Sequence, residues 1–203
     1  GLTSVKDGLL SSLQQKSIDD SLNEIYRFMY QSNSIDEILY LMLNGLTHKK
    51  AIGMDRCILF NCLKISNYHR LEAILATGLP DKNSLSDFSS PLHTEKEEIE
   101  FYKCFTKYQE DPQCIYAEPL LQKIRHEKIF ISSDFISKTI PEPQLVLNEL
   151  MIRDDLPSEL CYILEQIDAD NVLLFLLVFE PGKYILGVCD NLYEENEITP
   201  LQI

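Results

Sequence analysis

The stretch that decides the fold is NVLLFLLVFEPGKYILGVCDN, residues 171 to 191. Eight consecutive apolar residues, 172 to 179, precede Glu-Pro-Gly-Lys at 180 to 183, and a second β-rich run covers 184 to 189. Pro fixes φ near about −65° and Gly tolerates positive φ, so Pro-Gly between two such runs is typical of a turn between antiparallel strands. A strand that is apolar on both faces must be covered on both faces. The sequence therefore predicts a central hairpin with helices packed around it.

The turn also predicts a register for this hairpin. If Glu180 and Lys183 close the turn, counting back sets Leu176 opposite Gly187, so that a large side chain faces a position without one. A covering helix could then approach the sheet closely at Gly187. Pro-Gly favours a type II turn, which matches strand twist poorly, so a loop longer than two residues is also consistent with the sequence.

The residues before the hairpin show alternating helical and strand patterns. Ser34-Ile-Asp-Glu37 is a capping box, in which the Ser hydroxyl and the Glu carboxylate each satisfy a free backbone donor, and the helix behind it should end near Thr47. A second box at Thr94 predicts another helix. The remaining expected elements are a broken helix up to Gln31, strands at 55–63, 70–77 and 128–132, helices at 119–126, 144–153 and 158–167, and an irregular segment at 134–143.

Composition excludes several classes of protein. The net charge of −14 would repel a phosphate backbone, so we expect no nucleic-acid partner. The longest apolar run has eight residues, too short for a membrane-spanning helix, and we expect a cytoplasmic domain without membrane contact. The six cysteines include no C-x-x-C, which favours reduced, mostly buried thiols over disulfides.

Three segments resemble the sequence pattern of GAF domains. Residues 55–63 resemble the first strand of that family, ATGLP at 76–80 resembles the exit of its second strand, and 184–191 resemble its last strand. The resemblance covers residues 34–203. It implies an α+β, PAS-related fold in which an antiparallel sheet of five or six strands has helices on both faces. It also implies a small-molecule pocket between the sheet and the variable middle segment, 79–155.

The resemblance further implies an organisation and a role. Residues 1–33 would be an N-terminal helical extension that serves dimerisation, and 34–203 the GAF-like domain. Thr199-Pro200 is an N-cap and N1 pair, so we expect an output helix to begin there and to lead to an effector domain beyond Ile203. The chain would then be a non-enzymatic sensory or regulatory domain of a bacterial-type signalling protein, acting as a homodimer that forms through its N-terminal and C-terminal helices. It lacks the N-K-x-D/E pattern of cyclic-nucleotide-binding members and the bilin-binding signature, which makes those ligands improbable.

The candidate site residues lie in the middle segment. An aromatic and cationic set would suit a small anionic or planar ligand, although aromatic residues more often fill a core, with arginines at its rim: Tyr116, Arg125, Phe130, Phe135 and Arg153. No catalytic residue or metal site is assigned, because the histidines and carboxylates show no ligand spacing. We expect no cofactor, with haem left open through a single axial histidine, His93 or His126.

Two alternatives to a ligand-binding sensor stay open. One is a degenerate GAF scaffold that serves protein contact only. The other is a small-molecule redox enzyme that would use Cys104 and Cys114, or either of them with Cys161. Cys57 and Cys62 are five residues apart on one expected strand, so they should point to opposite faces and cannot pair with each other.

Overall fold

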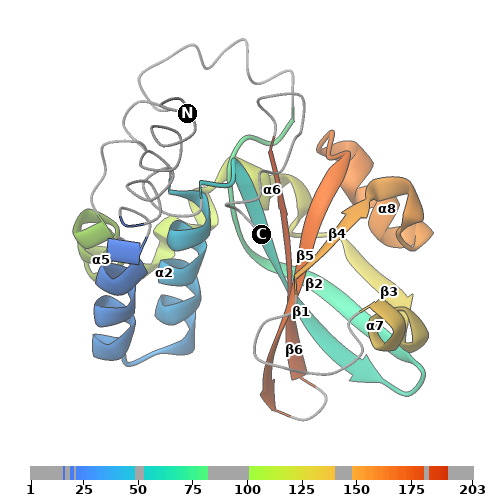
Figure 1. Ribbon diagram of the computed structural model, residues 1–203, viewed down its shortest axis with the longest axis horizontal. Helices are drawn as coiled ribbons and strands as arrows, with labels where there is room; N and C mark the ends of the chain where they lie inside the picture. The colour runs from blue at the N-terminus through green and yellow to red at the C-terminus, as the bar shows by residue number, and fades with distance from the viewer. Residues whose placement is uncertain are drawn as a thin grey trace, which may run out of the picture.

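The architecture is an antiparallel sheet between two layers of helices (Figure 1). The computed structural model describes residues 16, 19–20, 22–48, 53–81, 101–139, 148–180 and 183–191. Within these residues, six strands form one sheet in the order β3-β2-β1-β6-β5-β4, and each neighbouring pair is antiparallel. The strands are β1 (Arg56–Ile65), β2 (Tyr68–Thr77), β3 (Lys128–Ser132), β4 (Asn148–Ile152), β5 (Asn171–Glu180) and β6 (Lys183–Asp190).

Helices cover both faces of this sheet, as expected for the α+β class. On one face, the 13-residue helix α2 (Ile35–Thr47) packs on β1 and β2. The same face carries α5 (Phe101–Glu110) and the 3-10 turn η1 (Pro112–Ala117). The other face carries α6 (Pro119–Ile124), α7 (Ser133–Thr139) and α8 (Ser158–Gln166). Residues 22–31 are helical and precede α2. No helix in the described part of the chain is both long and apolar enough to span a bilayer.

The hairpin of β5 and β6 lies in the sheet as predicted, with a corrected register. Glu180 pairs with Lys183, but the ladder shifts between Val178 and Glu180, so that Phe175, and not Leu176, lies opposite Gly187. A Cβ at Gly187 would lie 2.0 Å from the Phe175 ring. The aromatic ring therefore occupies the space above the glycine, where the sequence predicts the approach of a helix.

The predicted helix at Ser34 is confirmed, and its capping box is half formed. Ser34 Oγ accepts a hydrogen bond from the Glu37 amide at 3.2 Å, and the helix ends at Thr47. The Glu37 carboxylate, however, accepts a hydrogen bond from Gln109 Nε2 of α5 at 2.5 Å. A side chain predicted to cap its own helix thus joins α2 to α5.

Two predicted segments have a different structure. The expected helix at 144–153 is in part the strand β4, which pairs with Asn171–Phe175 of β5 and is followed by the 3-10 turn η2 (Arg153–Asp155). A short apolar run is ambiguous between helix and strand, and pairing with the exposed edge of β5 decides it here. The segment expected to be irregular, 134–143, begins with α7. The helices predicted from Thr94 and from Thr199 begin outside the described residues.

Each face of the sheet has its own core. The face under α6, α7 and α8 buries a large cluster that includes Phe60, Leu164 and Leu186. The face under α2 and α5 buries a second cluster, which includes Leu43 and Phe175. As predicted from strand alternation, Cys57 belongs to the second cluster and Cys62 to the first.

Candidate functional site

A cavity of about 220 Å³ lies between the sheet and the middle segment. Its walls come from α2 and its C-cap, from the end of β2, from α5, and from η1 with the residue that follows it. The lining residues are Tyr40, Leu43, Asn44, Thr47, His48, Leu75, Ala76, Thr77, Lys103, Lys107, Ile115 and Glu118. At about 30 Å³ per water molecule, the volume corresponds to about seven waters. It is below the ~300–1,000 Å³ of sites for drug-sized molecules, so the cavity suits a compact ligand.

A bulge in β2 shapes the floor of the cavity. The pairing of β1 with β2 shifts between Leu59 and Phe60, which are opposite Leu75 and Ala73, so Ile74 is the extra residue. Ile74 and Leu75 consequently both pack against the cluster on the α2 face, which regular alternation would forbid. Bulges re-aim side chains in this way beside many binding sites.

The inner polar groups of the cavity are held by the last turns of α2. Asn44 Nδ2 donates to the Tyr40 carbonyl at 2.8 Å, and Thr47 Oγ1 donates to the Leu43 carbonyl at 2.9 Å. His48, the C-cap residue, is 6 % exposed. Side chains fixed by their own helix present a constant surface to a ligand.

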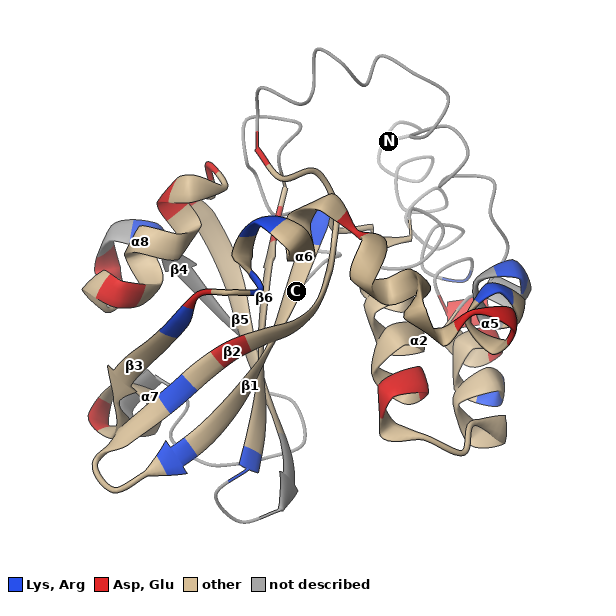
Figure 2. Ribbon diagram, turned by 180° about the vertical axis from the view of Figure 1, so that it is seen from behind, with Lys and Arg blue, Asp and Glu red and all other residues tan. Residues whose placement is uncertain are grey.

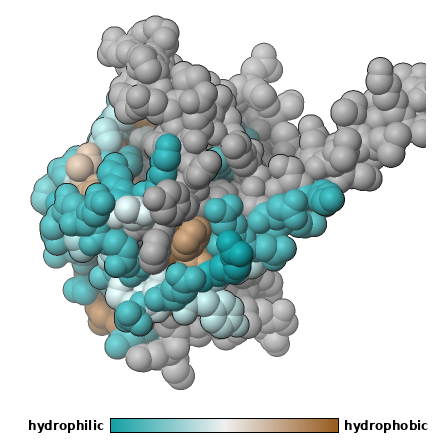
Figure 3. Space-filling model, turned by 90° about the vertical axis from the view of Figure 1, so that its left-hand side faces the viewer, coloured by the Kyte–Doolittle hydropathy of each residue, from teal (hydrophilic) through white to brown (hydrophobic). Residues whose placement is uncertain are grey.

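The charges at the cavity are mainly cationic, in contrast to the chain as a whole. Lys103 and Lys107 are one helical turn apart on α5, and among the described residues Glu118 is the one carboxylate in the lining. In Figure 2 the ribbon of α5 carries blue segments, whereas red segments mark acidic residues on α2 and α8. On the side where α2 and α5 lie, Figure 3 shows a mostly hydrophilic surface with a small hydrophobic area exposed. This arrangement can attract a small anion that also has an apolar part.

The five residues predicted to form a ligand site are not among those that line this cavity. Two of them meet: the Arg125 guanidinium lies 5.4 Å from the centre of the Tyr116 ring. Phe135 packs against the core of the opposite face, and Phe130 is 52 % exposed on the edge strand β3. Arg153 in η2 donates to the Ala169 carbonyl at 3.1 Å and forms an ion pair with Asp170. The structure therefore spreads the predicted set over both faces of the sheet.

The lysines that do line the cavity could have been found from their spacing. Lys103 and Lys107 are four residues apart in a segment with helical periodicity, which places both on one face. The cavity-lining residues of α2 could not be identified in the same way. The apolar stripe of α2 predicts a helix with a buried face, but it does not predict which part of that face borders a cavity.

The cysteines considered for redox catalysis do not form a reactive pair in the described residues. Cys114 is half-buried beside the cavity; burial raises the pKa of its thiol, and the charge of Lys107 offsets only part of that rise. Cys161 lies on α8, on the opposite face of the sheet. The side chain of Cys104 lies outside what the structure describes. A raised pKa leaves little of the thiolate that such chemistry requires.

Other candidate groups for chemistry are equally limited. His126 is exposed after α6, and His93, the other histidine considered for haem, lies outside the described residues. In the described ranges, no three or more His, Cys, Asp or Glu side chains are grouped to hold a metal ion.

A Ser–His pair, which the sequence did not suggest, lies at the far end of β2. Ser133 Oγ is 2.9 Å from His69 Nδ1, and burial together with the Lys64 charge lowers the pKa of His69. His69 is only 3 % exposed, and its Nε2 has no hydrogen-bond partner among the described residues. A general base needs access to a substrate and a group that orients it. We therefore interpret this pair as a structural contact between β2 and α7.

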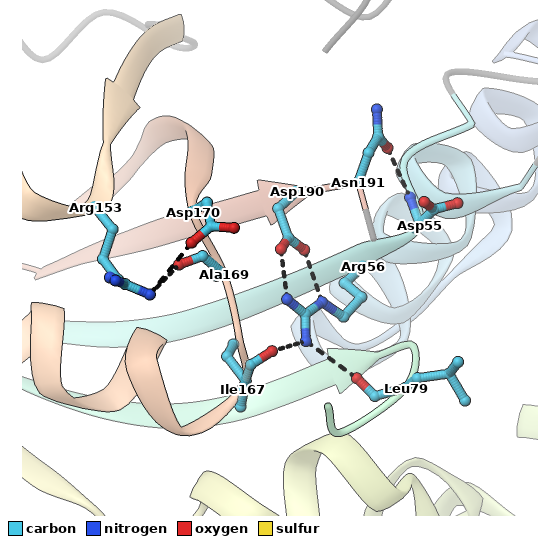
Figure 4. A network of polar contacts seen from close by, with 9 residues as sticks. All are labelled: Asp55, Arg56, Leu79, Arg153, Ile167, Ala169, Asp170, Asp190 and Asn191. Carbon is cyan, nitrogen blue, oxygen red and sulfur yellow. Dashed lines mark hydrogen bonds and ion pairs between the residues drawn. The ribbon is translucent and has the colours of Figure 1, made fainter. Parts of the chain in front are cut away.

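A buried ion pair joins the segments that resemble the GAF pattern (Figure 4). Arg56, 1 % exposed at the start of β1, donates from Nε to Asp190 Oδ1 at 2.8 Å and from Nη2 to Oδ2. Its Nη1 donates to the carbonyls of Ile167 and Leu79. Bidentate geometry of this kind gives the strongest ion pairs in proteins.

The residues next to this ion pair fit closely around it. Gly78 has φ of +122°, and a Cβ there would lie 2.5 Å from Arg56 Cγ, so only glycine fits without movement. The Asp55 amide donates to Asn191 Oδ1 at 3.1 Å. All three GAF-like segments therefore meet at one end of the central strands.

A scan against models of protein families finds no match to this sequence, and a search of curated proteins also finds none.

Proposed function

We propose that this chain is a GAF-type sensory domain that binds a small anionic ligand in the cavity between β2, α2, α5 and η1. The observation that carries the proposal is the position of the cavity. It lies between the sheet and the middle segment, which is where the resemblance to GAF domains implies a pocket. The meeting of the three GAF-like segments around Arg56 gives independent support.

The proposed action is a change of conformation and not a reaction. A ligand in the cavity touches α2, α5 and β2 together, so it favours whichever arrangement of these elements fits it better. In this proposal the domain is a cytoplasmic homodimer, and the helix at 22–31 transmits the change to the partner subunit and to an effector. Exposed apolar side chains support a contact there: Tyr26 is 52 % exposed and Tyr30 92 %.

The ligand part is tested with lysine variants in a thermal-shift assay. Benzoate, a compact planar anion, heads a panel of single-ring carboxylates, each titrated into the full chain. A ligand at 100 times its Kd should stabilise the protein by about 2.7 kcal/mol. Lys103→Gln/Lys107→Gln should lose most of this shift, whereas Lys128→Gln, an exposed lysine on the edge strand, should retain it.

The dimer part is tested separately by sedimentation. The parent chain should sediment as a dimer at high concentration, and Tyr26→Glu/Tyr30→Glu should shift it to monomer. A parent chain that stays monomeric at all concentrations would remove this part and leave the ligand part intact.

A degenerate scaffold that serves protein contact only is the second candidate. The observation that favours it is the small size of the cavity, below that of usual ligand sites. Native mass spectrometry of freshly purified protein separates the two candidates, because retained extra mass that is lost in the double lysine variant requires a ligand. No retained mass and no stabilisation by any anion of the panel would favour the scaffold.

A further inference from the structure

Two buried thiols face each other across the central strands. Cys57 on β1 lies directly opposite Cys189 on β6. The Cys189 thiol donates a hydrogen bond to the Cys57 sulfur, with 2.9 Å between the two Sγ atoms. Both side chains have no exposed surface. These are therefore adjacent thiols enclosed together in one core.

The backbone geometry already satisfies what a disulfide needs. Residues directly opposite in antiparallel strands have Cα atoms about 4.5–5.5 Å apart, within the ~4.4–6.8 Å range found for disulfides. The sulfurs would have to approach by roughly 0.9 Å to reach a bond length of about 2.05 Å. Small side-chain rotations can supply this movement without breaking the β1–β6 ladder.

The other buried cysteine shows that this arrangement does not follow from burial alone. Cys62 lies on the same strand as Cys57 and is equally enclosed, but it points to the opposite face. Its cross-strand neighbours are Leu71 and Tyr184, neither of which carries a thiol. Cys62 is therefore a matched control within the same strand.

We propose that Cys57 and Cys189 are the site of a reversible disulfide that forms when the folded protein meets a small oxidant of the peroxide class. The thiolate of one cysteine attacks a peroxide oxygen and the O–O bond breaks; the departing hydroxide takes up the proton that the thiol had released, so that a sulfenic acid and one water result. The second thiol attacks the sulfenic sulfur, forms the S–S bond and releases a second water. In sum, two thiols and one hydrogen peroxide give one disulfide and two waters.

The surroundings of the pair predict a slow reaction. Burial raises the pKa of Cys189, and the adjacent Cys57 and Asp190 add to the rise, so the thiolate is scarce at neutral pH. A peroxide is small enough to enter with little opening of the strands, unlike a bulky disulfide such as oxidised glutathione. The same enclosure should protect the disulfide, once formed, from bulky thiols. The pair would thus respond to sustained oxidation and not to brief exposure.

The crosslink would lie where it can affect the rest of the α2 face. Cys57 is also directly opposite Thr77, which lines the cavity. The adjacent pair in the same ladder is Arg56 and Asp190. Oxidation would therefore fasten β1 to β6 between the buried ion pair and the floor of the cavity.

The test is to map disulfides in the full chain after exposure to hydrogen peroxide. The folded protein is oxidised, quenched with catalase, alkylated under denaturing conditions and digested for mass spectrometry. The expected result is a linked peptide pair containing Cys57 and Cys189 that is two hydrogens lighter than the separate peptides and disappears after dithiothreitol. The oxidised protein should also melt at a higher temperature than the reduced one, because the crosslink spans 132 residues of chain.

Variants and a denatured sample complete the experiment. Cys62→Ala should form the crosslink at the parental rate, and Cys189→Ala should leave Cys57 free. The proposal is overturned if both thiols stay free under conditions that oxidise the half-buried Cys114 and Cys161. It is equally overturned if the linked peptides appear only when the protein is oxidised in urea, because the folded structure would then not direct the pairing. Both outcomes are read on the parent chain, so neither depends on the folding of a variant.

Discussion

Removing both partners of the Arg56–Asp190 ion pair should destabilise the fold by less than the sum of the two single removals. Asp190→Asn leaves a guanidinium that is 1 % exposed without its countercharge, and breaking a buried pair in this way costs about 3–5 kcal/mol. Arg56→Met leaves a buried carboxylate and also takes a donor from the carbonyls of Ile167 and Leu79. It should cost at least as much, since each buried group without a partner costs about 1–3 kcal/mol.

The double variant separates the charge from the other contacts. Arg56→Met/Asp190→Asn contains no buried charge, and its main remaining cost is the two carbonyls that lose Nη1. We therefore expect it to be less destabilised than the sum of the single variants by at least about 2 kcal/mol, near the upper end of measured pair couplings. Urea unfolding at pH 7, followed by circular dichroism, gives the three free energies by linear extrapolation.

Two results would refute this reasoning. If the losses of unfolding free energy in the two single variants add up to the loss in the double variant within about 0.5 kcal/mol, the two groups do not depend on each other. A cost of Asp190→Asn that disappears in 1 M NaCl would mean that solvent and salt reach the pair, since buried pairs are screened far less than exposed ones.

Three further predictions concern the hairpin, pH and thiol reactivity. Gly187→Ala should lower the free energy of unfolding in urea by about 1–3 kcal/mol, because its Cβ would overlap the Phe175 ring. Adding Phe175→Leu should recover part of this loss, and no recovery would contradict the clash. Burial lowers the pKa of His69 from its usual 6.5, so as the pH falls the unfolded state binds the proton before the folded state does. The contribution of neutral His69 to the free energy of unfolding is therefore complete above about pH 6.5 and decreases below it. His69→Gln should flatten the dependence of the unfolding free energy on pH between 7 and 5. Burial raises the pKa of Cys62 to about 12, so iodoacetamide at pH 8 should label the half-buried Cys161 but not Cys62 in the folded chain. Equal labelling rates of the two thiols would show that Cys62 is accessible.

The sequence predicted the elements whose signals are local. The hairpin has long apolar runs on either side of Pro-Gly, and the helix at Ser34 has a cap and a regular apolar stripe. Both were correct to within a few residues. The strand at 148–152 was missed because its five residues suit either structure, and only its partner β5 makes it a strand. Local patterns thus predicted elements, and pairing across the sheet changed one of them.

The site depended on distances that no local pattern contains. Alternation along β1 correctly placed Cys57 and Cys62 on opposite faces, but it could not identify Cys189, 132 residues later, as the partner of Cys57. The same limit applied to Tyr116 and Phe130, which were grouped because of their chemistry. Side chains within one segment can point to either face of the sheet, and the topology alone decides which of them meet.

The location of the cavity follows from how unequally the two faces are covered. On one face, α6, α7 and α8 close a continuous core. On the other, α2 packs along β1 and β2 and η1 contacts β2, while α5 is attached to α2 through the stacked rings of Tyr40 and Tyr108 and the Glu37–Gln109 hydrogen bond. Because α5 is held largely through α2, space remains at the end of β2, and that space is the cavity. A ligand bound there would contact α5 and the sheet at once, so among the described elements these are well placed to respond to binding.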